Sequence, residues 1–197
     1  YHNQIFWVDK IDVDNNGQVW YHLGEHFSYG DVFWGPAEAF RPISREEVAP
    51  ITPELTNKRI DINLARQTVS AFEDEREVFF ARVSTGRPDP ETETPPGNNF
   101  FIRRKMISSH LSGATSGGGW DLAGIGYTTF FMGSGIAFHS TFWHNNFGEK
   151  TSGGCINMKP EDSKWIFRWT QPFVDYDPGD VDFSGNFGGT IIRVIES

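Results

Sequence analysis

Alternating apolar and polar side chains near the middle of the chain place the strongest constraint on its fold. From Arg59 to Leu64, an isoleucine or leucine stands at every second position, with charged or amide residues between. A period of two is typical of a β-strand that buries one face. Two similar segments follow at residues 68–72 and 78–83, joined by the charged run 73–77. The pattern predicts three antiparallel strands in a mainly β fold.

A hairpin is predicted near the N-terminus, where Asp14-Asn15-Asn16-Gly17 separates two aromatic-rich segments. The same residues resemble the start of a calcium-binding loop. Such a loop needs a glutamate at its twelfth position, which is Leu23 here. The turn is therefore the favoured interpretation.

Two glycine- or proline-rich segments are predicted to be loops. Residues 86–99 are rich in proline, threonine and glutamate, and residues 108–126 contain six glycines and show no periodicity. A loop of the second kind is often functional, so it is predicted to be a lid or wall of an active site. A disordered hairpin insertion is the alternative. Pro160 and the two acidic residues after it predict the start of a short amphipathic helix.

Composition excludes some classes of function. The 197 residues carry a formal charge of −9, and the only basic run is Arg103–Lys105. Nucleic-acid binding is not expected, because phosphate neutralisation requires a basic face. No apolar run approaches the roughly 20 residues that span a bilayer. The segment at Tyr1 is not of the signal type, so the chain is interpreted as a mature or trimmed fragment.

A single cysteine, Cys155, follows Ser152-Gly153-Gly154. One cysteine excludes an internal disulfide and leaves two readings, an inert small hydrophobe or a nucleophile. His139 lies sixteen residues upstream, and an imidazole is the usual means of activating a thiol. Glycines before a nucleophile can also aim backbone N–H groups at a developing oxyanion.

This stretch resembles the signature of the L,D-transpeptidase (YkuD-like) catalytic domain. That signature is a histidine and, about fifteen residues later, Ser/Thr-His-Gly-Cys-apolar-Asn. Gly153 departs from it, because a histidine usually stands there. The resemblance covers residues 58–197 and includes S-T-G-R-P at 84–88 and T-P-P-G-N-N-F at 94–100. The matching residues of the signature are His139, Ser152, Gly154, Cys155, Ile156 and Asn157.

The resemblance implies a β-sandwich of the L,D-transpeptidase type, with one short helix after the cysteine. Residues 58–197 would form the catalytic domain and residues 52–57 a linker. Residues 1–51 resemble, more weakly, a small bacterial SH3-like β module, complete or cut short at Tyr1.

The resemblance also implies roles for individual residues. Cys155 would be the nucleophile and His139 the general base, oriented by the backbone carbonyl of Ser140. The N–H groups of Gly153, Gly154 and Cys155 would form the oxyanion hole. The substrate would contact Tyr127, Trp143, Ser152 and Asn157, of which Trp143 could equally be a core residue and Asn157 would brace the turn.

Other histidines are expected to play no direct part in catalysis. His110 and His144 are predicted to be structural or surface residues. A zinc site built from His139, His144 and Cys155 would lack the paired spacing that such sites use, so it is disfavoured. No metal or organic cofactor is implied.

The expected function is a peptidoglycan L,D-transpeptidase that forms 3→3 crosslinks through a cysteine acyl-enzyme and releases D-alanine. With water as acceptor, the same site would be an L,D-carboxypeptidase. Gly153 and the N-terminal module also allow a non-catalytic wall-binding protein. A papain- or NlpC-type peptidase is disfavoured, because those place Cys before His. The resemblance implies a role in cell-wall biogenesis and cell shape, stem peptides and carbapenem β-lactams as ligands, an extracytoplasmic location and a monomer.

Overall fold

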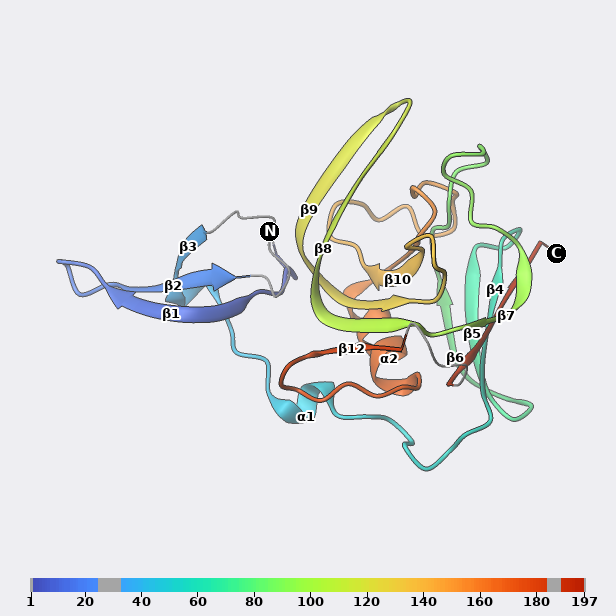
Figure 1. The fold of residues 1–197 in the computed structure, drawn as a ribbon, viewed down its shortest axis with the longest axis horizontal. Coiled ribbons are helices and arrows are strands. Elements are labelled where there is room, and N and C mark those ends of the chain that lie inside the picture. The colour runs from blue at the N-terminus through green and yellow to red at the C-terminus, as the bar shows by residue number, and fades with distance from the viewer. Residues whose placement is uncertain (1, 25–32, 184–188, 197) are drawn as a thin grey trace.

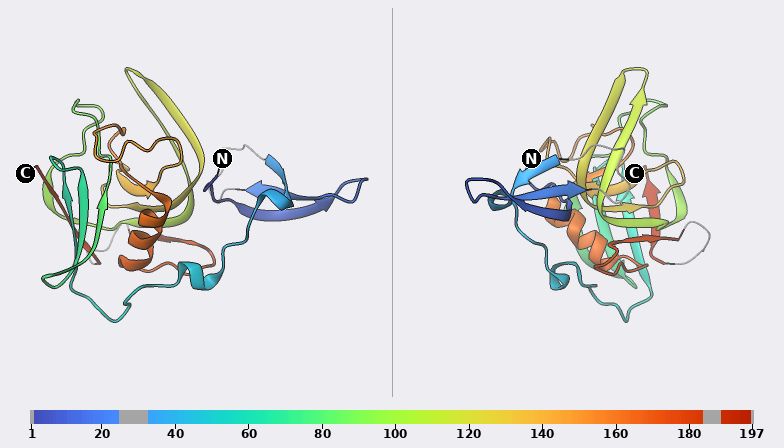
Figure 2. Two further views of the ribbon diagram at one scale, coloured as in Figure 1. Left: turned by 180° about the vertical axis from the view of Figure 1, so that it is seen from behind. Right: turned by 60° about the vertical axis from the view of Figure 1, so that its left-hand side comes forward.

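Three β-sheets dominate the computed structural model, which describes residues 2–24, 33–183 and 189–196 (Figure 1). Two five-stranded sheets and a helix form the main body. A three-stranded sheet near the N-terminus lies to one side of that body (Figure 2). The prediction of a mainly β fold is confirmed.

The first five-stranded sheet contains the strands predicted from alternation. Its order is β6 (Arg76–Arg82), β5 (Thr68–Glu73), β4 (Lys58–Asn63), β13 (Ile191–Ile195) and β7 (Gly97–Phe101). Along β4, every second residue is buried, and Ile60 and Ile62 are fully buried. The period of two therefore arises from one face of this sheet packing into the core.

The second five-stranded sheet carries the residues of the histidine–cysteine signature at one edge. Its order is β11 (Ile156–Met158), β10 (Ala137–Ser140), β9 (Gly118–Phe130), β8 (Arg104–Thr115) and β12 (Asp180–Asp182). β11 runs parallel to β10, whereas β9 runs antiparallel to it. The two strands that hold His139 and follow Cys155 are therefore direct neighbours.

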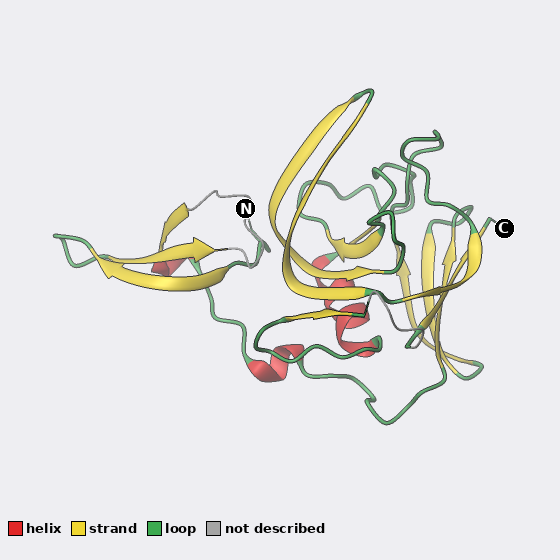
Figure 3. Cartoon of the chain, in the orientation of Figure 1, coloured by secondary structure: helices red, strands yellow, loops and turns green. Residues whose placement is uncertain are grey.

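The helix α2 (Pro160–Trp169) begins at the predicted proline and lies in the middle of the main body (Figure 3). Ile166 and Trp169 belong to the larger apolar core, and Phe167 belongs to a second core with Ile107 and Tyr127. The helix thus joins both cores. Among the described residues, no helix is long and apolar enough to cross a membrane.

The N-terminal sheet consists of β1 (Trp7–Val13), β2 (Val19–Gly24) and β3 (Phe33–Pro36), followed by a 3₁₀ turn, η1 (Ala37–Ala39). The predicted turn at Asp14 is confirmed. Its carboxylate accepts the backbone N–H groups of Asn16 and Gln18 at 2.8 and 3.0 Å. The Asp14 carboxylate is therefore engaged in hydrogen bonds within the turn. The likeness of the sheet to SH3 modules stays a prediction.

A short strap connects the N-terminal sheet to the main body. It contains α1 (Arg45–Val48), which is capped by the side chain of Ser44. Glu47 lies 2.9 Å from Lys164 of α2, and the Arg168 side chain donates to the carbonyl of Ala49 at 2.7 Å. The strap therefore packs along the helix, whereas the predicted linker bounds at 52–57 stay a prediction.

The predicted loop at 108–126 is wrong, because these residues form a long hairpin of β8 and β9 that projects from the main body (Figure 1). Near its base both faces of the hairpin are buried, and near its tip neither face is buried. Neither half can therefore show the alternation by which a half-buried strand is recognised. The strand before the hairpin, β7, ends at Phe101, and β8 begins at Arg104.

Two buried lysines hold the end of α2. Lys105 is fully buried, and its Nζ donates to the carbonyls of Thr170 and Pro172, both at 2.8 Å. Lys58 donates to the carbonyl of Trp169 at 2.9 Å. Carbonyls at a helix C-terminus lack intrahelical partners and favour a nearby cation. Burial, however, lowers the pKa of Lys105 well below its usual value of 10.5, and Lys58 lowers it further.

We expect the free energy of unfolding of wild type, relative to that of Lys105→Met, to increase as the pH rises toward 10.5. Between the lowered folded-state pKa and that value, the unfolded chain binds a proton that folded Lys105 does not. The slope should be at most about 1.4 kcal/mol per pH unit. Urea unfolding between neutral pH and that limit measures it. Lys10→Met, at an exposed position, is the control. A difference in free energy of unfolding between wild type and Lys105→Met that does not change with pH would contradict this assignment.

Candidate active site

Parallel pairing of β10 and β11 brings the signature residues together. Phe138 pairs with Ile156 and His139 with Asn157, so Cys155 lies one step before this ladder. Asn157 and His139 are register partners and share a face, and extending the alternation of β11 back to Cys155 would place its side chain on that face too. The Cα atoms of Cys155 and His139 are then roughly 8 Å apart, from a rise of about 3.3 Å per residue and a strand spacing of about 4.8 Å. Two side chains that point to one side can meet across that distance.

The His139 ring is oriented by its own strand. Its Nδ1 lies 3.0 Å from the backbone carbonyl of Ser140, the partner that the resemblance implies. Only a protonated Nδ1 can donate to a carbonyl, so Nε2 of the neutral ring is the acceptor. His139 is buried, and this burial lowers its pKa to about 4. At neutral pH the ring is therefore an uncharged base.

The Cys155 thiol is also uncharged at neutral pH. Burial raises its pKa to about 11, although a hydrogen bond with the backbone of Ala137 acts in the opposite direction. Sγ lies 3.8 Å from the carbonyl of Gly135. A neutral thiol beside a neutral imidazole transfers its proton only when sulfur attacks, which is general-base catalysis rather than a preformed ion pair.

Ser152 shapes the turn before the nucleophile. Its hydroxyl accepts the N–H of Gly154 at 3.0 Å and donates to the carbonyl of Cys155 at 2.6 Å. The Ser152 hydroxyl and the Gly154 N–H are thus engaged within the turn. A substrate contact at Ser152 and an oxyanion-hole role for Gly154 stay predictions. The N–H groups of Gly153 and Cys155 have no partner in the described part of the chain and stay available.

The loop before β7 supports this turn from the other side. The Thr94 hydroxyl donates to the carbonyl of Gly154 at 2.7 Å and accepts the N–H of Gly86 at 2.9 Å. A Cβ at Gly86 would lie 2.0 Å from the carbonyl oxygen of Thr92, so only glycine fits there. The S-T-G-R-P segment of the resemblance therefore acts by packing against the nucleophile turn.

Tyr127 lies in the second apolar core. Its ring is buried against Phe167 of α2, with ring centroids 5.7 Å apart, in the core that also contains Val48 and Ile107. Burial raises the pKa of its phenol to about 12. The side chain therefore points into the core, and a contact of Tyr127 with substrate stays a prediction.

Trp143 and Asn157 occupy different environments. The Trp143 ring stacks on that of His139 at 5.8 Å and is 40% exposed, so it is not a core residue and lies open to a ligand. Asn157 is buried, and its amide lies 2.9 Å from Nε2 of His144. Asn157 thus braces the site through its side chain, while a contact with substrate stays a prediction. His144, predicted to be a structural or surface residue, is part of this support.

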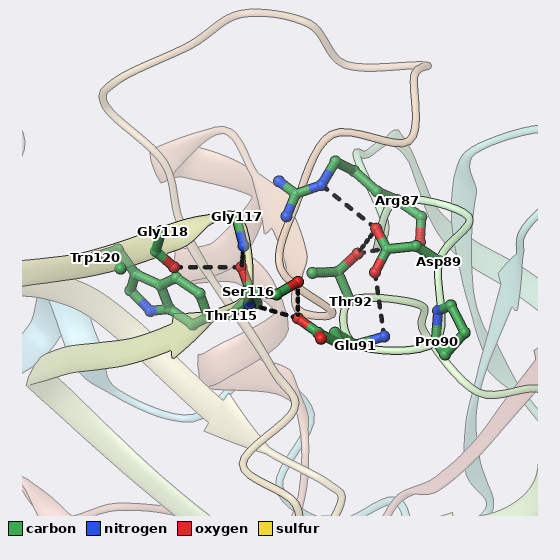
Figure 4. A pocket seen from close by; sticks show the side chains of 11 residues that line it. Arg87, Asp89, Pro90, Glu91, Thr92, Thr115, Ser116, Gly117, Gly118 and Trp120 are labelled. Atoms are coloured by element: carbon green, nitrogen blue, oxygen red, sulfur yellow. Dashed lines mark hydrogen bonds and ion pairs between the residues drawn. The ribbon is translucent and has the colours of Figure 1, made fainter.

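A cavity of about 710 Å³ lies between the hairpin tip and the loop that begins at Arg87 (Figure 4). Glu91 of that loop accepts the N–H and the hydroxyl of Ser116 at 2.7 and 3.0 Å, which ties the tip to the loop. Trp120 lines the cavity and also borders the nucleophile turn, since a Cβ on Gly153 would lie 3.3 Å from its ring. Sequence reasoning missed Trp120, although a lone tryptophan among glycines was a signal.

The described residues contain no group of three His, Cys, Asp or Glu side chains that could hold a metal ion. Of the two other histidines considered, His110 pairs with Asp121 across the hairpin. His144 bonds Asn157 as described above. The turn supplies a thiol and backbone N–H groups, and β10 supplies the imidazole of His139.

Solved structures share this fold. An L,D-transpeptidase from Mycobacterium smegmatis has 18% identity over 71% of this chain and 58% of that chain, with a TM-score of 0.54. A cysteine-to-serine mutant of the Enterococcus faecium L,D-transpeptidase has 20% identity over 73% and 51%, with a TM-score of 0.53. L,D-transpeptidase 3 from Mycobacterium tuberculosis, in complex with a faropenem-derived adduct, has 20% identity over 72% and 61%, with a TM-score of 0.54. The chain thus spans between half and two thirds of the length of these proteins.

No curated protein sequence matches the chain. Residues 57–190, about two thirds of its length, match the sequence model of the YkuD L,D-transpeptidase catalytic domain. The chain therefore belongs to the L,D-transpeptidase catalytic domain (YkuD) family.

Proposed function

We propose that the protein is a peptidoglycan L,D-transpeptidase that forms 3→3 crosslinks through an acyl-enzyme on Cys155. The observation that carries this proposal is the parallel register of β10 and β11, which pairs His139 with Asn157 and brings Ile156, the residue after Cys155, beside Phe138. The Nδ1 contact with the Ser140 carbonyl leaves Nε2 of His139 as the proton acceptor. Family membership supplies the reaction class.

In the first half-reaction, the thiol proton of Cys155 moves to Nε2 of His139 while sulfur attacks the carbonyl carbon of the third stem residue. The resulting oxyanion would accept hydrogen bonds from the N–H groups of Gly153 and Cys155. When the C–N bond breaks, the imidazolium returns its proton to the departing amine of D-alanine. A thioester remains on Cys155.

In the second half-reaction, the side-chain amine of another stem peptide attacks the thioester. His139 takes one proton from this amine and delivers it to the leaving sulfur, which restores the thiol. The product is the crosslinked dimer. Water in place of the amine would give a tripeptide, and the protein would then be an L,D-carboxypeptidase. The exposed Trp143 ring beside His139 offers a surface for the acceptor.

A carbapenem or penem should acylate the same sulfur, because its ring carbonyl presents the same kind of electrophile. The solved relative with a faropenem-derived adduct supports this extension. A peptidoglycan substrate would place the protein outside the cytoplasm. The alternative of a wall-binding protein with an inactive site is the opposing outcome of the experiment below.

We expect wild-type protein incubated with purified disaccharide tetrapeptides to give crosslinked dimers and free D-alanine, detected by mass spectrometry. Cys155→Ala should form neither product. His139→Gln should reduce turnover by about 10²–10⁴-fold, the usual contribution of a general base. Tripeptides without dimers would identify a carboxypeptidase. An intact wild-type fold that forms no product and no carbapenem adduct would instead support the wall-binding alternative.

The pKa values of the pair predict two different pH profiles. Alkylation of Cys155 by iodoacetamide requires thiolate, so its rate should rise about tenfold per pH unit above neutrality, as expected for a pKa of about 11. Acylation by a carbapenem requires neutral His139, so it should fail only as the pH falls toward about 4. Intact-mass time courses measure both rates. An alkylation rate that is already maximal at pH 7 would reveal a thiolate–imidazolium pair and contradict this assignment.

The Trp120 ring occupies the space beside Gly153. A Cβ there would lie 3.3 Å from the ring, so an imidazole requires Trp120 to move. Gly153→His should therefore lower the rate of carbapenem acylation rather than raise it. The double variant Gly153→His, Trp120→Ala should recover part of the loss, with Trp120→Ala alone as the control. A gain of activity in Gly153→His alone would show that the glycine impairs the site.

A further inference from the structure

His144 has no part in the proton transfers proposed above, yet its ring uses both nitrogens. It lies in the segment 141–155, which connects β10 to β11. Nδ1 accepts the backbone N–H of Asn146 at 3.1 Å. Nε2 lies 2.9 Å from Nδ2 of Asn157. The ring is partly buried, packed between Trp143 and Phe147.

The first of these contacts determines the tautomer. A ring nitrogen that accepts a backbone N–H cannot carry a proton, so the proton of neutral His144 is on Nε2. Two N–H groups cannot face each other. The Asn157 amide therefore turns its oxygen toward Nε2, since the two ends of an amide exchange by rotation of the side chain. Burial lowers the pKa of His144, which favours this neutral form.

These bonds belong to a closed circuit of four residues. The Ser84 hydroxyl donates to the carbonyl of Asn146 at 2.7 Å. The backbones of Ser84 and Asn157 exchange two hydrogen bonds of 2.8 and 3.0 Å. His144 closes the circuit between Asn146 and Asn157. One side chain thus ties the connecting segment to β11.

The circuit lies next to the reacting groups. Asn157 is the register partner of His139 and stands two residues after Cys155. Trp143, the neighbour of His144 in the chain, stacks on the His139 ring. A displacement of His144 would therefore disturb both the strand that follows the nucleophile and the ring that acts as base.

We propose that His144 is a positioning residue: its Nε2–H holds the Asn157 side chain and thereby keeps Cys155 and His139 in register. This inference rests on the proposed roles of Cys155 and His139. It assigns to this chain a second functional imidazole, supplied by the connecting segment. In this chain Gly153 stands where the L,D-transpeptidase signature has a histidine.

Two matched variants separate the two contacts of the ring. His144→Gln places an amide N–H near the former Nε2 and can still bond Asn157. His144→Asn places an oxygen near the former Nδ1 and can still accept the N–H of Asn146, but does not reach Asn157. We expect carbapenem acylation to stay within about twofold of wild type in His144→Gln and to fall about tenfold or more in His144→Asn, since small misplacements of reacting groups are costly. Thermal unfolding verifies that both variants fold.

A second measurement does not depend on activity. Long-range ¹⁵N–¹H spectra should show His144 as the Nε2–H tautomer at pH 7. The resonances of Cys155 and of the His139 ring should shift in His144→Asn and remain in place in His144→Gln. An Nδ1–H tautomer, or equal effects of the two variants, would overturn the inference. If wild type carries out no acylation, the proposed function fails, and these spectra still decide the role of His144.

Discussion

The short parallel ladder between β10 and β11 is the constraint on which the rest of the site depends. Adjacent parallel strands cannot be joined by a tight turn and need a crossover of about a dozen residues or more. Here the crossover is the segment 141–155, which has no helix of its own. The spacing of histidine and cysteine in the signature is therefore the length of chain that a parallel crossover requires. Because the ladder sets the register, the same spacing also determines which side chains share a face.

A crossover without regular structure must be held by specific contacts, and this one is held from several sides. Ser152 closes the nucleophile turn, Thr94 supports it through the carbonyl of Gly154, and the S-T-G-R-P segment packs beneath it. The circuit through His144 fixes the other end of the crossover.

Burial determines the protonation states of Cys155 and His139. It raises the pKa of the Cys155 thiol and lowers that of the His139 imidazole, so the pair is neutral before substrate arrives. Charge would develop only as sulfur attacks, next to backbone N–H groups that face no other partner in the described chain. Trp120 fills the space that a side chain at position 153 would occupy. The absence of a side chain at Gly153 therefore leaves room for the Trp120 ring of the hairpin.

The sequence by itself determined the family, the mainly β class, the helix at Pro160 and the identity of the candidate nucleophile and base, because these depend on local spacing and on alternation along one strand. It could not place Tyr127, Ser152 or Asn157, since a motif does not say whether a side chain faces a ligand or bonds within the protein. It also missed the hairpin of β8 and β9, in which both faces are buried near the base and neither is buried near the tip. Only the tertiary structure brought Trp120 beside Gly153 and His144 beside Asn157. The physical reason is that these contacts join side chains whose environments are set by how separate strands and loops pack, and not by the residues that flank them in the chain.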